Sequence, residues 1–139
     1  MKVVLDASVL IKWLLADPER EAHTEKATDL VMAVGRGELD LILPGHWLVE
    51  VAAVLCRISP QTAQGDVETL HLLDWPTLDT PSLYRVATRL AVELRYHLFD
   101  TLYHATALET GATLVTADAH YWRKAGGLGR ITLLPDFTV

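Results

Sequence analysis

The first eleven residues hold the pattern that most constrains the fold of this chain. Val3-Val4-Leu5 is an apolar, largely β-branched run that predicts a fully buried strand, and after Ala7-Ser8 a second apolar run predicts the start of a helix. Asp6 is the only charged residue between these two runs. A buried carboxylate without a partner costs several kcal/mol or stays protonated. Asp6 therefore needs a cation, a hydrogen-bonding loop or water at the end of its strand, which in an open α/β sheet is where ligands bind.

Strands and helices are predicted to alternate along the rest of the chain. Further buried strands are expected at 41–43, 113–116 and 131–134, with a minor edge strand at 77–78. Helices are expected over 8–16, 17–34, 46–58, 59–73, 80–96, 100–110 and 120–125. No hairpin signal separates the strands, so the pattern indicates a three-layer α/β/α sandwich with a central parallel sheet of four or five strands.

Three predicted helices begin at a capping residue followed by proline. Asp17-Pro18, Ser59-Pro60 and Thr80-Pro81 each combine a side chain that can cap a helix with a proline suited to the first turn. Glycines at 35, 37 and 111 are expected to end helices. These signals set the expected helix boundaries.

The length and composition suit one globular domain covering 1–139. The chain has 139 residues, half of them hydrophobic and 22% charged. Its only cysteine, Cys56, excludes an intrachain disulfide and is expected to be an ordinary buried thiol on a helix. No signal-peptide pattern and no apolar run near the ~20 residues of a membrane span are present, so we expect a cytoplasmic protein without membrane association.

Three other acids share the unusual context of Asp6. Glu50 is the only polar residue from 47 to 55, Asp100 falls in the first turn of a predicted helix, and Asp118 follows a predicted strand. Each has a structural alternative, because Asp100 and Asp118 can cap helices and Glu50 can pair with an arginine such as Arg57. Taken together, four isolated carboxylates suit an oxygen-liganded ion such as Mg²⁺ or Mn²⁺.

The net charge of the chain bears on whether it can bind nucleic acid. At −6, the chain is more acidic than most proteins that bind nucleic acid. Setting aside four metal-binding carboxylates leaves −2, and two divalent ions would neutralise those four acids. The acidic composition is therefore compatible with a nucleic-acid substrate if the acids hold metal.

Four segments resemble, in order, the PIN-domain ribonucleases, and more closely the small VapC-type toxins of bacteria and archaea. The segments are Val-Val-Leu-Asp-Ala-Ser-Val at 3–9, Pro-Gly-His-Trp-Leu-Val-Glu-Val-Ala at 44–52, Phe-Asp-Thr-Leu-Tyr-His-Ala-Thr-Ala at 99–107 and Leu-Val-Thr-Ala-Asp at 114–118. The ending Leu-Leu-Pro-Asp-Phe is also similar to that of the family. The resemblance spans nearly the whole chain and implies a single PIN domain.

The resemblance assigns roles to particular residues. It implies that the metal-binding acids are Asp6, Glu50, Asp100 and Asp118, and that Thr116 is the Ser/Thr found near the catalytic site. Ser8 matches the small polar residue that follows the first acid. The expected activity is a metal-dependent endoribonuclease that uses water to cut single-stranded or loop RNA. The resemblance also implies a toxin that forms a homodimer and is inhibited by a small antitoxin protein.

Other residues near the four motifs give weaker signals. Arg123 and Lys124 follow Asp118 closely and are expected to contact the RNA backbone, together with Ser8. His104 lies four residues after Asp100 on the same helix face, and we expect it to be a half-exposed packing residue.

Two alternative functions remain open at this point. A catalytically silent PIN-like binding module would keep the fold, and it would differ from a nuclease in not needing to bind Mn²⁺. A phosphotransfer domain is the other alternative. A receiver has neighbouring acids after its first strand and an aspartate-nucleophile phosphatase has Asp-x-Asp, whereas Asp6-Ala7-Ser8 matches neither.

Overall fold

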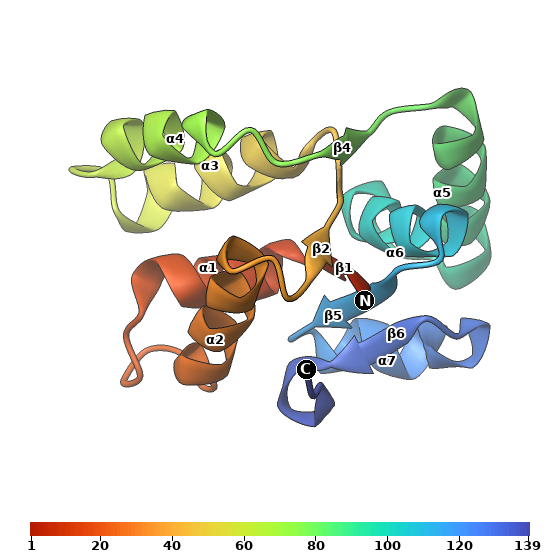
Figure 1. The fold of residues 1–139 in the computed structure, drawn as a ribbon. Coiled ribbons are helices and arrows are strands. Elements are labelled where there is room, and N and C mark those ends of the chain that lie inside the picture. The colour runs from red at the N-terminus through yellow and green to blue at the C-terminus, as the bar shows by residue number, and fades with distance from the viewer.

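The computed structural model describes residues 1–139 and contains two parallel sheets (Figure 1). The main sheet has four strands in the order β2-β1-β5-β6. These strands are β1 (Lys2–Leu5), β2 (Asp40–Leu41), β5 (Thr113–Thr116) and β6 (Ile131–Leu133). A separate pair joins β3 (Leu43–Pro44) to β4 (Thr77–Leu78). The predicted α/β architecture with a central parallel sheet is confirmed.

Helices fill the connections between the strands, except that β2 and β3 are separated by Ile42 alone. They are α1 (Ala7–Leu15), α2 (Thr24–Gly35), α3 (Trp47–Ile58), α4 (Ala63–Leu72), α5 (Pro81–Leu94), α6 (Leu98–Thr110) and α7 (Ala119–Ala125). Short 3₁₀ turns follow at Gly126–Leu128 and Leu134–Asp136.

The helices lie on both sides of the main sheet. Helices α1 and α2 connect β1 to β2, whereas α7 connects β5 to β6 in the opposite direction across the sheet. Crossovers of the usual right hand put these two connections on opposite faces, and Figure 1 shows α1 and α2 together, away from α5 and α6. From β1 the chain crosses to β2 at one edge, whereas from β5 it crosses to β6 at the opposite edge. The neighbouring strands β1 and β5 therefore form the switch point of the sheet, where α/β proteins bind ligands.

The core is built around β1 and α6. Val3, Val4 and Leu5 are completely buried within a cluster of 28 buried residues. Helix α6 is buried continuously over seven residues, 101–107, because it packs against both α5 and the strands β1 and β5. No helix of the structure is both long enough and apolar enough to cross a bilayer.

Several predicted boundaries are wrong. The helix expected from residue 17 begins at Thr24, because the Asp17 side chain accepts a hydrogen bond from the Glu19 N–H in a separate turn and His23 has a left-handed backbone (φ 61°). The strand predicted at 41–43 divides between β2 and β3, which pair in different sheets.

Two predictions about the neighbouring helices also need correction. The helix predicted from Ser59 begins four residues later, at Ala63, after a single turn closed by the Ser59 carbonyl. Cys56 is exposed rather than buried, because α3 turns Val51 and Leu55 toward the core and Cys56 lies on the face outside it.

Candidate functional site

Two of the four acids lie side by side at the carboxyl end of the main sheet. Strands β1 and β5 are parallel neighbours in which Leu5 pairs with Val115, so the residues that follow them emerge at the same edge. The Asp6 N–H extends this pairing by donating to the Val115 carbonyl at 3.0 Å. Asp6 then caps α1, and Asp118 caps α7 by accepting from the Tyr121 N–H. Both carboxylates stand at helix N-termini, where negative charge is favoured.

The other two acids reach the same place from different helices. Glu50 lies in the first turn of α3 and Asp100 in the first turn of α6. All four predicted acids line one cavity of about 370 Å³. The structure thus brings together side chains from four separate segments of the sequence. No three His, Cys, Asp or Glu side chains are arranged as a ready-made site for one metal ion.

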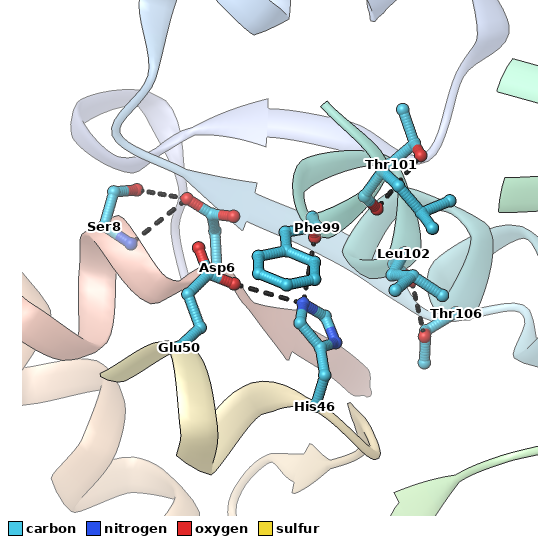
Figure 2. Close-up of polar contacts among 9 residues, drawn as sticks. Asp6, Ser8, His46, Glu50, Phe99, Thr101, Leu102 and Thr106 are labelled. Atoms are coloured by element: carbon cyan, nitrogen blue, oxygen red, sulfur yellow. Dashed lines mark hydrogen bonds and ion pairs between the residues drawn. The ribbon is translucent and has the colours of Figure 1, made fainter. Parts of the chain in front are cut away.

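Asp6 is fixed by two hydroxyl side chains. Its Oδ2 accepts from the Ser8 N–H (3.1 Å) and the Ser8 hydroxyl (2.5 Å), as Figure 2 shows, and from the Thr116 hydroxyl at 3.4 Å. Ser8 Oγ accepts from the Ala117 N–H at 3.0 Å, and Thr116 Oγ1 accepts from the Asp118 N–H at 3.1 Å. Ser8 and Thr116 therefore tie the ends of β1 and β5 together around Asp6.

Glu50 has a partner that the sequence did not reveal. His46 Nε2 lies 3.1 Å from Glu50 Oε2 and 3.1 Å from the Phe99 carbonyl oxygen, between the two groups in Figure 2. The Phe99 carbonyl oxygen can only accept, so Nε2 carries the hydrogen. The pairing with Arg57 considered above is not formed. The spacing of four residues between His46 and Glu50 on one helix turn was the available signal.

Asp118 is the only one of the four acids that accepts hydrogen bonds through both carboxylate oxygens. Its Oδ1 accepts from the Tyr121 N–H at 3.1 Å and its Oδ2 from the Tyr96 hydroxyl at 2.8 Å. By contrast, Asp6 and Glu50 are each bonded through one oxygen only. The carboxylate of Asp100 forms no hydrogen bond with the protein. The oxygens free to accept a ligand are therefore concentrated on Asp6, Glu50 and Asp100.

Burial, together with the charges of neighbouring acids, raises the pKa values of two of the four carboxyl groups. Burial raises the pKa of Asp6 to about 6; the charges of Glu50 and Asp118 add to the effect and the hydrogen bonds from Ser8 oppose it. Burial also raises the pKa of Asp100 to about 7, with contributions from the charges of Asp6, Glu50 and Asp118. A bound cation would stabilise the ionised carboxylates and so lower the pKa values of both Asp6 and Asp100. The donor set, made only of carboxylate oxygens, fits the preference of Mg²⁺ or Mn²⁺.

The basic residues predicted to contact substrate lie outside the cavity. Lys124 donates from Nζ to the Leu94 carbonyl at 3.2 Å and lies 5.6 Å from the centroid of the Tyr96 ring. Arg123 is exposed on α7. The cavity wall instead contains Lys12 and Glu21, which the sequence analysis did not select.

The prediction that His104 is a half-exposed packing residue is wrong. It is completely buried, with Nδ1 2.9 Å from the Tyr121 hydroxyl and Nε2 2.9 Å from the Gly129 carbonyl. Burial lowers the pKa of its ring. Its place on α6, at the centre of the buried segment, explains why a shared helix face with Asp100 does not bring it into the cavity.

Comparisons with solved structures show the same fold in several proteins. A toxin–antitoxin complex from Klebsiella pneumoniae matches with a TM-score of 0.67 and 14% identity over 99% of both chains. The VapBC2 complex from Rickettsia felis, bound to a DNA fragment from its promoter, matches with a TM-score of 0.66 and 14% identity over 96% of this chain and 97% of the other. PAE2754 from Pyrobaculum aerophilum matches with a TM-score of 0.64 and 21% identity over 97% of this chain and 90% of the other.

Sequence comparison identifies the family directly. No curated protein matches the sequence closely enough to count as a relative. The family model described as the PIN domain, however, matches residues 3–128, a range that contains all four acids of the cavity. Fold and sequence agree, and the chain belongs to the PIN domain family.

Proposed function

We propose that this chain is a metal-dependent endoribonuclease. The observation that carries the proposal is the single cavity at the β1/β5 switch point, lined by Asp6, Glu50, Asp100 and Asp118. PIN domains as a family are nucleases, and the match over 3–128 makes nuclease activity the expected class of function. The choice of RNA over DNA and the need for Mg²⁺ or Mn²⁺ are parts of the proposal.

Each acid has a role that follows from its hydrogen bonds. Asp6, Glu50 and Asp100 would hold the ion, because each keeps at least one carboxylate oxygen free of protein partners. Asp118, bonded through both oxygens, would orient water rather than bind the ion directly. When bound, the ion lowers the pKa of a water molecule and offsets charge on the scissile phosphate.

The surrounding side chains would hold this arrangement in place. Ser8 and Thr116 fix Asp6, and His46 fixes Glu50. In the proposed reaction the oxygen of water bonds to phosphorus, the bond from phosphorus to the 3′ oxygen breaks, and that oxygen takes up a proton. The products carry a 5′-phosphate and a 3′-hydroxyl, and the 2′-hydroxyl of RNA is not used. Exposed Arg123 and Lys124 would contact the strand outside the cavity.

We further propose a biological role as the toxin of a toxin–antitoxin pair acting in the cytoplasm. The support is the fold shared with toxin–antitoxin complexes from Klebsiella pneumoniae and Rickettsia felis. The residues 1–139 would act as one PIN domain, as a homodimer inhibited by a small antitoxin protein. Exposed apolar side chains on and after the α3/α4 pair, including Val49, Leu72 and Leu73, supply surface for such contacts.

A catalytically silent PIN-like binding module is the alternative. The observation that favours it is that no three His, Cys, Asp or Glu side chains are already arranged as a site for one ion. Binding of Mn²⁺ discriminates between the two functions. A nuclease of this kind binds the ion with the help of Asp100, whereas a silent module has no need to do so.

The test of the proposed function is cleavage of 5′-labelled single-stranded RNA by the purified chain in Mn²⁺, with sequencing of the RNA ends. We expect 5′-phosphate and 3′-hydroxyl ends, no cleavage in EDTA, and a loss of at least about 100-fold for Asp6→Asn or Asp100→Asn. Asp29→Asn, which alters an exposed acid on α2, is the matched control and should keep full activity. Full activity in EDTA or in Asp6→Asn would refute the mechanism.

A further inference from the structure

The cavity wall contains one basic side chain, and that side chain is already paired. Among the residues that line the cavity, Lys12 is the only lysine or arginine, and Glu21 is a fifth acid. Lys12 Nζ lies 2.7 Å from Glu21 Oε2. Only 12% of the Lys12 side chain is exposed, against 30% for Glu21. The ammonium group is therefore held inside the cavity, while its partner remains open to solvent on one side.

The positions of the two residues are set by different kinds of structure. Lys12 lies on α1, four residues after Ser8 and hence on the same helix face as the residue that fixes Asp6. Glu21 lies in the turns between α1 and α2, outside any helix. Because it is more exposed and not part of a helix, Glu21 can rotate away from Lys12 without breaking a packed helical contact.

The charges explain why such a lysine matters. A substrate strand carries negative phosphates into a cavity lined by five acids. Metal ions offset the acids that bind them, but phosphate oxygens that do not touch an ion still need a donor. An ammonium group offers three donors and a full positive charge, and it binds carboxylate and phosphate oxygens by the same charge-assisted hydrogen bonds. The Glu21 carboxylate, an anion that binds an ammonium group as a phosphate does, therefore already holds the Lys12 ammonium group.

We propose that Lys12 binds a phosphate group of the substrate RNA, and that Glu21 competes with this phosphate for the lysine. The inference rests on the proposed ribonuclease function and adds a substrate-binding residue and an internal competitor to it. On binding, the RNA phosphate replaces the Glu21 carboxylate at Nζ, and Glu21 turns toward solvent.

The proposal predicts opposite effects for the two partners of one ion pair. Lys12→Met keeps the length of the side chain but removes its charge, so RNA affinity should fall roughly three- to tenfold and the slope of log K against log salt should decrease by about 0.7. Glu21→Gln removes the competing charge, so RNA affinity should rise. Lys12→Arg keeps the charge and should retain most of the affinity. An ion pair that lies away from the bound RNA gives no such opposition.

The experiment measures binding of a fluorescent single-stranded RNA in Mn²⁺, in an Asp100→Asn background that is expected not to cleave it. Thermal unfolding of every variant checks that the chain is folded. The matched control is the exposed pair Arg36–Glu38, which lies 2.6 Å apart from Nε to Oε1 and outside the cavity. Arg36→Met and Glu38→Gln should leave RNA affinity unchanged.

The outcomes separate the inference from the function on which it rests. If Lys12→Met and Glu21→Gln leave RNA affinity unchanged, or change it in the same direction, Lys12 only ties the turns after α1 to the helix and the inference is wrong. If the wild-type chain neither cuts nor binds RNA, the proposed function fails and the inference falls with it. Opposite shifts, with retained affinity in Lys12→Arg, support the inference, whereas the cleavage assay tests the nuclease function separately.

Discussion

Removing the charge of Asp6 should stabilise the metal-free protein. Burial and neighbouring acids raise the pKa of Asp6 from 3.8 to about 6. A shift of roughly 2 units at about 1.4 kcal/mol each means that the ionised carboxylate lowers the free energy of unfolding by about 3 kcal/mol. Asp6→Asn keeps an oxygen that can accept from Ser8 and removes this charge. In EDTA at pH 8, we expect the variant to be more stable by about 1–3 kcal/mol.

The pH dependence follows from the direction of the shift. Between about pH 4 and 6 the native state holds a proton on Asp6 that the unfolded chain has released. The stability linked to this group is therefore fully present below the unfolded pKa and falls as the pH rises through about 6. At pH 4.5 the advantage of Asp6→Asn should shrink to about 1 kcal/mol. The raised pKa of Asp100, about 7, extends the same trend toward neutral pH.

The assay is urea unfolding in EDTA at pH 4.5 and 8, followed by the same measurement in millimolar Mn²⁺. Mn²⁺ should stabilise the wild type by mass action and Asp6→Asn much less. Asp29→Asn, in an exposed position on α2, should leave the unfolding curves in EDTA and in Mn²⁺ unchanged. An Asp6→Asn variant that is less stable than wild type in EDTA at pH 8 would refute the reasoning. The favourable cap on α1 and the bonds from Ser8 would then outweigh burial and repulsion.

Two further predictions concern histidines. His46→Leu leaves Glu50 and the Phe99 carbonyl without their shared donor, so Mn²⁺ affinity measured by calorimetry should fall. His46→Gln keeps an N–H donor and should retain part of that affinity. Equal affinities in His46→Leu and the wild type would show that His46 does not position Glu50. His104→Phe leaves the buried Tyr121 hydroxyl and the Gly129 carbonyl unpaired. Urea unfolding should therefore show a free energy of unfolding that is lower by about 1–3 kcal/mol. An unchanged unfolding midpoint would contradict a stabilising role for these two hydrogen bonds.

The parts of the molecule that depend on local pattern could be predicted from the sequence. The apolar run at 3–5 became the central strand β1, and Thr80-Pro81 opens α5 with the Thr80 hydroxyl accepting from the Leu83 N–H. The four acids could be selected because each is an isolated charge in an apolar or strand-end context. Parallel pairing of β1 with β5 then accounts for the meeting of Asp6 and Asp118.

The parts that depend on contacts between distant segments could not be predicted. The sequence shows only that His104 shares a helix face with Asp100, and the positions of Tyr121 and Gly129 are needed to show that its ring is fully bonded. The hydroxyl of Tyr96 reaches Asp118 across 22 residues of sequence. Glu21 belongs to the cavity because of how the turns after α1 fold back toward Lys12, which no local pattern indicates.

The position of β1 has a consequence for the order of events during synthesis. This strand is made before the other strands of its sheet but lies inside the sheet, with β2 on one side and β5 on the other. The bond from Thr116 to Asp6 spans 110 residues. On the ribosome, the first acid therefore has no β5 beside it until residues 113–116 have emerged. Nascent chains and products of early termination carry Asp6, Glu50 and even Asp100 but lack the strand that joins them into one cavity. The complete cavity can therefore form only after residues 113–118 have been translated.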